Sequence, residues 1–596
     1  MATDQTSNDA QERARTAAIA ELMKVVERDP RKALADVQTL LRRSPQSPNL
    51  LRVAAAAHRK LGEATLAQKA EITAIHHSSA VPAIAEAAKQ MDAQEFGEAS
   101  RLLALHLQRE PDDLAALTLS TEAGIALGVA YKVLPMLEKV LSRAPGFLRA
   151  RILYANALML TDRLTDALRV IQPVVEKRPD DPELVNLLSR IHAERGDYAR
   201  ATKTNETLVR LDPKSPEALT NLGDSLRFDG KREQAIATYR RSIAQDPYHG
   251  RAWWSLADLD ATALTSDDVA QIRMALEKRC DQPEHAGNLH FALGIAHDNA
   301  GQAEVAFEQF SAGNRLRRVA QPYQAQDISS QVDRYLDAIG DRPEMPTHKQ
   351  DAGLPVPIFV LGMPRAGSTL VERMLGQHSA IEALGELSIV PHMVDRLRND
   401  VGADKLEKTV ASLGEAALAN MAQAYVTRAK ERMKTNASFF VDKLHMNWRH
   451  LPLILRMLPQ ARIIDIRRDA MDCCWSNFKT LFARGHPAAS DLTDIGRFYC
   501  DYVRQTDALA QRFPERIHLQ NYEELVDSAE GQTKAIFAAM DIPFEPQVLE
   551  FHLSKNPVAT ASSEQVRKPL NRKGIGAWKP YEPWLAPLRK ALGEIR

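Results

Sequence analysis

The sequence predicts a chain in two parts, an all-α stretch built from repeated helix pairs followed by an α/β domain with a parallel sheet. Three observations lead to this prediction. Prolines recur every 34 residues in the first half, and short apolar runs alternate with helical stretches in the second half. The length of 596 residues also exceeds what a single hydrophobic core supports, so two or more domains are expected.

The 34-residue period appears at three sets of positions. The prolines that carry it are Pro111, Pro145, Pro179, Pro213 and Pro247. The turn residues that share the step are Gly128, Asp162, Gly196 and Gly230, and the small or β-branched residues that share it are Val133, Ala167, Ala201 and Ala235. Each period therefore predicts a helix, a turn, and a second helix that a proline ends. Small side chains inside the period would let the paired helices approach closely.

A helix pair of this length resembles the tetratricopeptide repeat. The resemblance implies a superhelical scaffold over residues 16–320, with a concave face for a protein or peptide acceptor. The repeats could instead only support the second half or join two copies of the chain as a homodimer. Residues 1–15, which precede the repeats, are expected to be disordered.

Composition excludes several kinds of partner. Lysine plus arginine and aspartate plus glutamate number 77 each, so no global charge attracts nucleic acid or an anionic membrane. Four cysteines give no disulfide framework, which suits a reducing compartment.

The N-terminus lacks the apolar stretch of a signal peptide, and no run of about 18 apolar residues could span a membrane. We therefore expect a soluble, cytoplasmic protein.

After the repeats the pattern of the sequence changes. Residues 321–356 are expected to be a linker region because prolines and charges occur there without periodicity. Residues 357–596 then alternate between strand-like and helical stretches, which predicts a parallel sheet with its ligands at the carboxyl ends of the strands. The expected strands are 358–362, 438–443, 461–468 and 516–522.

The first expected strand leads into a tight loop and a helix start. Gly362 and Gly367 have the spacing of an ATP-binding loop, but Ser368 stands where that loop carries its lysine. A glycine loop at a helix N-terminus still presents backbone amides to an anion. The sequence therefore predicts an anion site that does not take the end of ATP.

A second anion-binding element is predicted after the strand at 461–468. The strand ends at Arg468, and Asp469 is a good N-cap for the helix that follows. Ser476 lies eight residues after Arg468, so both side chains could reach one anion near the carboxyl end of the strand.

Together these elements resemble the two cofactor loops of the sulfotransferases. The 5′-phosphosulfate loop of that family has the pattern P-R-[SA]-G-[ST]-[ST], which is matched by Pro364, Arg365, Ala366, Gly367, Ser368 and Thr369. The 3′-phosphate element of the family pairs an arginine after a strand with a serine eight residues on, as Arg468 and Ser476 do. The resemblance extends from residue 357 to about 580. It implies 3′-phosphoadenosine 5′-phosphosulfate (PAPS) as the donor, a P-loop-like fold and no metal.

Further motifs are similar to tyrosylprotein sulfotransferases and to bacterial repeat-fused sulfotransferases. Gly385-Glu386 lies where the tyrosylprotein enzymes carry a glutamate base, and Lys443 lies where the family has a lysine near the bridging oxygen. His445 is the rival base, because Lys443-Leu444-His445 matches the Lys-x-His spacing of small-molecule sulfotransferases.

The segment 562–578 resembles the part of the family that covers the cofactor. It begins at Ser562, but Ala577 stands where the family has a basic residue. We expect Arg572, Lys573 or Lys579 to supply that charge instead.

These resemblances imply a sulfotransferase that moves the sulfuryl group of PAPS to a hydroxyl by in-line displacement. A tyrosine on a protein or peptide recruited by the repeats is the expected acceptor. A sugar or lipid hydroxyl, a P-loop NTPase activity and a repeat adaptor without catalysis are the alternatives.

Overall fold

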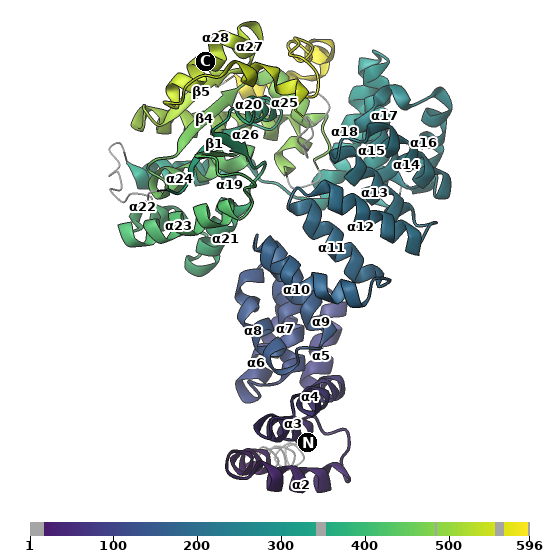
Figure 1. Ribbon diagram of the computed structural model, residues 1–596. Helices are drawn as coiled ribbons and strands as arrows, with labels where there is room; N and C mark the ends of the chain where they lie inside the picture. The colour runs from purple at the N-terminus through teal and green to yellow at the C-terminus, as the bar shows by residue number, and fades with distance from the viewer. Residues whose placement is uncertain (1–16, 280, 341–352, 483–485, 555–565, 594–596) are drawn as a thin grey trace. The chain divides into compact units, whose positions relative to one another are not determined.

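The computed structural model describes residues 17–279, 281–340, 353–482, 486–554 and 566–593 (Figure 1). The chain forms two compact units, Met1–Pro179 and Asp180–Arg596. The predicted disordered segment 1–15 lies outside the described residues.

The described part of the first unit, residues 17–179, is helical. Residues 17–28 form a helix, and the helices after it are α2 (Pro30–Leu41), α3 (Pro48–Lys60), α4 (Ala64–Ser78), α5 (Pro82–Asp92), α6 (Phe96–Arg109), α7 (Leu114–Ala126), α8 (Ala130–Arg143), α9 (Leu148–Leu160) and α10 (Leu164–Lys177). The second unit opens with helices of the same kind. They are α11 (Pro182–Glu194), α12 (Tyr198–Leu211), α13 (Pro216–Phe228), α14 (Arg232–Gln245), α15 (Gly250–Leu259), η1 (Ala261–Ala263), α16 (Ser266–Arg279), α17 (Pro283–Asn299) and α18 (Ala303–Ala320).

The periodic residues set the helix ends as the sequence predicts. Helices α6, α8, α10, α12 and α14 each stop two residues before a periodic proline. The residue between the helix end and the proline has non-helical backbone angles, as at Glu110, where φ is −125° and ψ is 69°. A proline disfavours helical backbone at the residue before it. The predicted turn residues all have positive φ, from 62° at Asp162 to 81° at Gly230.

The small periodic residues are where paired helices touch. Ala167, Ala201 and Ala235 have no exposed surface, and Val133 is 4% exposed. In the pair α13–α14, Tyr239 packs against Gly223 so closely that a Cβ on Gly223 would lie 2.4 Å from the ring. The predicted helical repeat is confirmed.

A helix occupies part of the range that the sequence predicts as a linker. Helix α19 (Ala325–Ile339) buries Ile328, Val332 and Tyr335 in the same core as the sheet that follows. Their spacing of four and three residues makes one apolar face, which the mixed composition of 321–356 obscured. The boundary between the compact units falls at Pro179, and the boundaries that the sequence suggests at 320 and 357 stay predictions.

The second half of Asp180–Arg596 is built on a five-stranded parallel sheet. Its strands are β1 (Val356–Gly362), β2 (Ile381–Ala383), β3 (Phe439–Asp442), β4 (Arg462–Arg467) and β5 (Ile517–Asn521). They lie in the order β2-β3-β1-β4-β5. Four of the five were expected from the sequence, and the three-residue β2 was not.

Helices cover the sheet and connect its strands. They are α20 (Ser368–Leu375), α21 (Ile389–Val401), α22 (Leu406–Ser412), α23 (Glu415–Lys430), η2 (His445–His450), α24 (Leu451–Met457), α25 (Ala470–Phe478), η3 (Pro487–Ser490), α26 (Leu492–Arg512), α27 (Tyr522–Asp527), α28 (Ala529–Ala539), η4 (Pro546–Leu553), η5 (Lys579–Trp584) and α29 (Ala586–Leu592).

The order of the strands decides which loops meet. Central strand β1 pairs with β4 through Leu361 and Asp465, and with β3 through Phe359 and Asp442. The carboxyl ends of these three parallel strands therefore lie side by side. The residues that follow each strand are therefore brought to one edge of the sheet.

Repeat helix α18 packs directly on α25 of the sheet domain. The Phe307 ring stacks with the rings of Trp475, Phe478 and Trp584 at centroid distances of 6.1, 6.1 and 5.6 Å. The Asn314 side-chain amide donates to the Phe478 carbonyl oxygen at 2.8 Å. The last repeat helices and the sheet domain therefore share one core.

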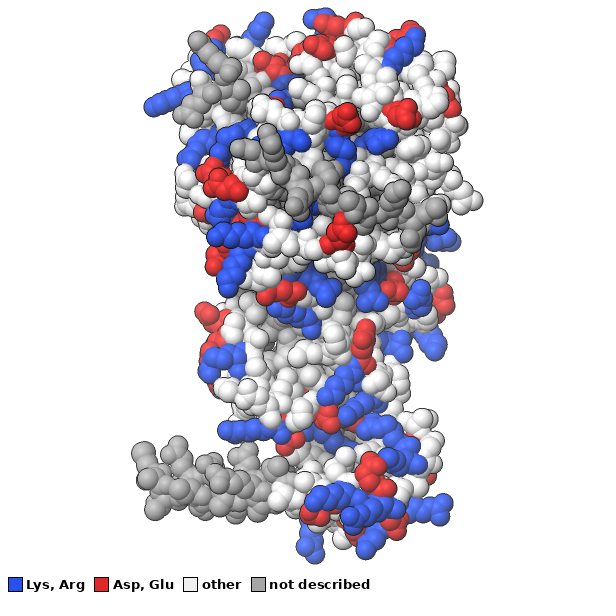
Figure 2. Space-filling model, turned by 90° about the vertical axis from the view of Figure 1, so that its left-hand side faces the viewer, with Lys and Arg blue, Asp and Glu red and all other residues white. Residues whose placement is uncertain are grey.

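Positive and negative side chains are interspersed over the face shown in Figure 2. This mixture agrees with equal numbers of basic and acidic residues. Within the described ranges, no helix has the length and apolar character needed to cross a membrane.

Candidate active site

The loop after β1 presents backbone amides at the start of a buried helix. Gly367 is the N-cap of α20, with φ of 109°, and a Cβ there would lie 2.6 Å from the Tyr522 ring. Arg365 has φ of 67°, a value that residues with a side chain rarely adopt and that tends to occur at functional sites. The first amides of a helix have no acceptor within the helix, so this N-terminus is suited to an anion.

Hydrogen bonds join this loop to the second predicted anion element. The Asn477 side-chain amide donates to the Pro364 carbonyl oxygen at 2.7 Å. Arg365 Nε donates to Ser476 Oγ at 3.3 Å, and Arg468 Nη1 donates to the Arg365 carbonyl oxygen at 3.0 Å. The structure thus brings together three residues that the sequence predicts for the site, although Arg365 lies more than 100 positions before Arg468 and Ser476 in the chain.

Arg468 lies at the centre of this arrangement and is only 8% exposed. Its guanidinium carbon is 5.4 Å from the centre of the Tyr522 ring, and Nη2 donates to the Gly574 carbonyl oxygen. Its Nε is buried and has no hydrogen-bond acceptor among the described residues. A buried donor left unpaired costs free energy, so this atom is suited to a bound anion.

The C-terminal segment is held beside Arg468 by Asp472. The carboxylate accepts from the backbone N–H of Gly576 at 2.6 Å and of Trp578 at 3.2 Å. These bonds fix the segment next to the two anion-binding elements.

The basic residues predicted from this segment are placed differently from Arg468. Arg572 is 68% exposed and forms an ion pair with Asp527, and Lys573 and Lys579 are exposed. Ser562 lies outside the described residues. The contribution of these four residues to the site stays a prediction.

A lysine lies between two carboxylates at the carboxyl end of β3. Lys443 Nζ is 2.6 Å from Glu386 Oε1 and 3.7 Å from Glu372 Oε2, and its side chain is 1% exposed. Burial alone would lower the pKa of Lys443, but the Glu386 and Glu372 carboxylates hold it above its usual value. The lysine is therefore positively charged at neutral pH.

The two candidate bases lie beside each other. His445 Nδ1 is 3.9 Å from Glu386 Oε1, and their side chains are 20% and 38% exposed. Burial lowers the pKa of His445, although Glu386 opposes the change. A neutral imidazole can accept a proton, so the geometry leaves both residues as candidates.

Three residues at the site were missed from the sequence. Glu372 and Asp472 are polar residues inside helices, and Tyr522 follows β5. Thr369 and Glu372 have the S/T-x-x-E spacing of a capping box, which indicates a helix start rather than a site. Only the folded chain shows that these side chains meet the predicted ones.

The repeats also contribute a charge beside the loop. Burial lowers the pKa of the Arg365 guanidinium, and the next influence is the Asp258 carboxylate of α15, which raises it. Asp258 itself forms a 2.7 Å ion pair with Arg227 of α13, which is 6% exposed. A sequence reading that treats the two halves separately could not have found this proximity.

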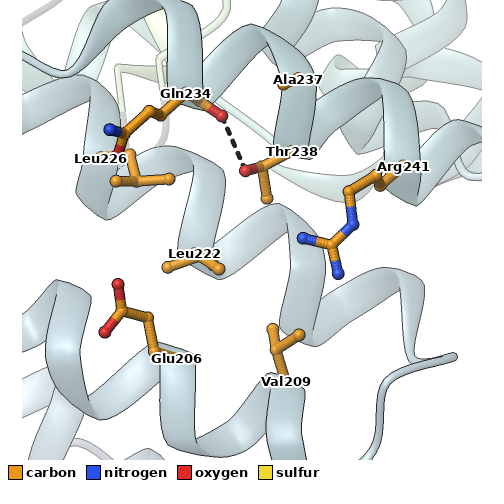
Figure 3. Close-up of a pocket in the computed structure, with 8 residues that line it drawn as sticks. All are labelled: Glu206, Val209, Leu222, Leu226, Gln234, Ala237, Thr238 and Arg241. Atoms are coloured by element: carbon orange, nitrogen blue, oxygen red, sulfur yellow. Dashed lines mark hydrogen bonds between the residues drawn. The ribbon is translucent and has the colours of Figure 1, made fainter.

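A separate pocket of about 400 Å³ lies among α12, α13 and α14 (Figure 3). Its lining residues are Glu206, Val209, Leu222, Leu226, Gln234, Ala237, Thr238 and Arg241. One acidic and one basic side chain flank a largely apolar floor.

No group of three or more His, Cys, Asp or Glu side chains in the described part of the chain is placed to hold a metal ion. The donors at the loop edge are arginines, a lysine and backbone amides, which suit anions.

Comparison with known families agrees with the two-part fold. Residues 357–546 match a model of the sulfotransferase family. Residues 132–191 and 220–261 match models of the tetratricopeptide repeat. The second half is therefore a sulfotransferase-family domain. The chain joins this domain to tetratricopeptide repeats.

Individual relatives cover different parts of the chain. An uncharacterized protein of Aquifex aeolicus is 28% identical over 430 residues, which is 70% of this chain and 56% of that protein. Protein-tyrosine sulfotransferase 1 of Danio rerio is 22% identical over 244 residues, which is 37% of this chain and 65% of that protein. The chain thus spans less than two thirds of either relative. The solved sulfotransferase domain from the curacin biosynthetic pathway is 19% identical, with a TM-score of 0.30, and the match covers 41% of this chain and 98% of that one.

Proposed function

We propose that this chain transfers the sulfuryl group of PAPS to a hydroxyl on a protein or peptide acceptor. One observation carries the proposal. The anion-binding loop, Arg468 and the Lys443–Glu386 pair meet at the carboxyl ends of β1, β4 and β3. This edge of a parallel α/β sheet is where ligands bind.

The residues present are suited to both ends of PAPS. The backbone amides of residues 366–369, together with Arg365, would hold the phosphosulfate end, once the Ala366 N–H gives up its 3.2 Å hydrogen bond to the Met363 carbonyl oxygen. Arg365 would also stabilise negative charge on the bridging oxygen. Arg468 and Ser476 would hold the 3′-phosphate, and the buried Nε of Arg468 supports this assignment. When bound, PAPS supplies the activated sulfuryl group.

The remaining site residues would supply the general base and stabilise negative charge. Glu386 would accept the proton of the attacking hydroxyl, with His445 as the alternative base. Lys443, held charged by two carboxylates, would stabilise negative charge that develops on the leaving oxygen. Positioning and electrostatics of this kind are sufficient for transfer through a loose, charge-spread transition state.

A tyrosine hydroxyl is the acceptor that we favour. The named relatives include protein-tyrosine sulfotransferases, and repeats of this type present surfaces for proteins or peptides. Sugar and lipid hydroxyls are the alternatives. A cytoplasmic location stays a prediction.

Calorimetric titration with adenosine 3′,5′-bisphosphate, the product left after sulfuryl transfer, tests the proposal. We expect binding without magnesium and at least about tenfold weaker binding by Arg468→Ala, because charge-assisted hydrogen bonds to an anion are lost.

Arg200→Ala is the matched control. Its guanidinium is exposed on repeat helix α12 and already pairs with Asp197, so we expect nearly unchanged affinity. Binding of ATP with magnesium in place of the bisphosphate would overturn the proposal and favour an NTPase. Binding of neither ligand would leave the repeat adaptor.

A further inference from the structure

Glu372 is a buried carboxylate at the candidate active site to which the proposed reaction gives no role. It lies on α20, the helix whose N-terminus forms the anion-binding loop, and it is 8% exposed. A carboxylate so placed is costly unless its charge and hydrogen bonds are compensated. Its contacts show what compensates it.

The Glu372 carboxylate contacts Lys443 and the residue directly before Glu386. Lys443 Nζ is 3.7 Å from Glu372 Oε2. The backbone N–H of Gly385, directly before Glu386, donates a hydrogen bond to the same carboxylate. Lys443 is also bonded to this turn through its backbone, since its N–H donates to the Gly385 carbonyl oxygen at 2.9 Å.

The turn next to Glu372 has a conformation that glycine adopts easily and that other residues rarely adopt. Gly385 has φ of 75°, in the left-handed region that favours glycine. A Cβ on Gly385 would be 4.0 Å from Glu372 Oε1, so the carboxylate packs directly over this turn. The direction in which Glu386 leaves the turn therefore depends on Glu372.

We propose that Glu372 is a positioning residue for sulfuryl transfer, which holds the Lys443 ammonium together with Glu386 and fixes the turn that carries Glu386. The inference rests on the proposed function, since it assigns Lys443 and Glu386 to that reaction. Glu372 acts through these two neighbours and does not itself contact the reacting atoms.

Three elements supply the charged and titratable groups around Glu372, Glu386 and Lys443. Helix α20 supplies Glu372 and Arg373, and the turn after β2 supplies Glu386. The end of β3 and the start of η2 supply Asp442, Lys443 and His445. Burial raises the pKa of Glu372, and the Lys443 ammonium is the strongest opposing influence.

The test is the pH dependence of adenosine 3′,5′-bisphosphate affinity for Glu372→Gln, measured by calorimetry from about pH 7 to about pH 11, across the range where lysines titrate. The glutamine keeps an oxygen for the Gly385 N–H but removes one negative charge beside Lys443. A lysine carries its charge below its pKa and loses it as the pH rises through that pKa. We therefore expect affinity to fall at a pH about one unit lower than in the wild type.

Two further variants keep the test decisive. Glu372→Asp retains the charge at a shorter reach and should move the alkaline loss most of the way back to the wild-type position. Glu530→Gln removes an exposed glutamate, paired only with Lys534 in the same helix, and should leave the profile unchanged.

The possible failures are distinguishable. If Glu372→Gln binds the bisphosphate with the wild-type pH profile, the positioning role is wrong while the proposed function stands. If Glu372→Gln does not fold, Glu372→Ala removes the same negative charge, and a wild-type pH profile for that variant rejects the role equally. If the wild-type protein binds no bisphosphate at any pH, the proposed function itself fails.

Discussion

Replacing Trp475 with alanine is expected to destabilise the unit Asp180–Arg596 by about 3–5 kcal/mol, the usual cost of removing a buried aromatic ring. The Trp475 side chain has no exposed surface. Its ring lies 4.1 Å from that of Tyr581 and 6.1 Å from that of Phe307, measured between centroids. The substitution would therefore leave a cavity between repeat helix α18 and helix α25 of the sheet domain.

Urea unfolding followed by far-ultraviolet circular dichroism measures this change. Val319→Ala is the control, because Val319 belongs to α18 but is 82% exposed, and a surface change of this kind is expected to stay within about 0.5 kcal/mol. A loss below about 1 kcal/mol for Trp475→Ala would show that the contact between α18 and α25 does not hold in solution. Since Ser476 follows Trp475 directly, we also expect weaker bisphosphate binding by the variant.

Replacing Glu386 with glutamine is expected to slow sulfuryl transfer by about 10²–10⁴-fold, the usual contribution of a general base. At neutral pH the affinity for adenosine 3′,5′-bisphosphate should change little, because Lys443 keeps Glu372 as a neighbouring carboxylate and the loop, Arg468 and Ser476 still hold the phosphates. The measurement is the steady-state rate of transfer from radiolabelled PAPS to an acceptor found by screening tyrosine-containing peptides.

His445→Asn is the matched variant for this prediction. The two side chains are 3.9 Å apart and share one environment, so each substitution perturbs the same region. With Glu386 as the base, His445→Asn should cost less than about tenfold, a value below the range for losing a general base. The opposite order of losses would assign proton transfer to His445.

The sequence predicted the parts of this molecule that depend on local pattern. Periodic prolines end helices whatever those helices pack against, and the alternation of strands and helices specified a parallel sheet. The PRAGST loop and the spacing from Arg468 to Ser476 are also local, and the sheet order then placed these elements together.

The features that the sequence did not reveal depend on contacts between distant segments. Glu372 has the pattern of a helix-capping residue, and only the fold places it against Lys443. Asp258 belongs to a repeat and Arg365 to the loop, so their proximity follows from how α15 packs. Helix α19 buries only three large side chains. Because prolines and charges flank it, the sequence pattern of this range predicted a linker and not a helix.

The contact of Phe307 with Trp475, Phe478 and Trp584 limits where the chain can be cut into fragments. By its position in the chain Phe307 belongs to the repeats, yet its ring completes the hydrophobic interior of the other half. A fragment that begins after residue 320 would present those three aromatic rings to water. The sulfotransferase-family domain is therefore not a detachable module, and exchanging its repeats for those of another protein would require the whole α18 surface to be transplanted with it.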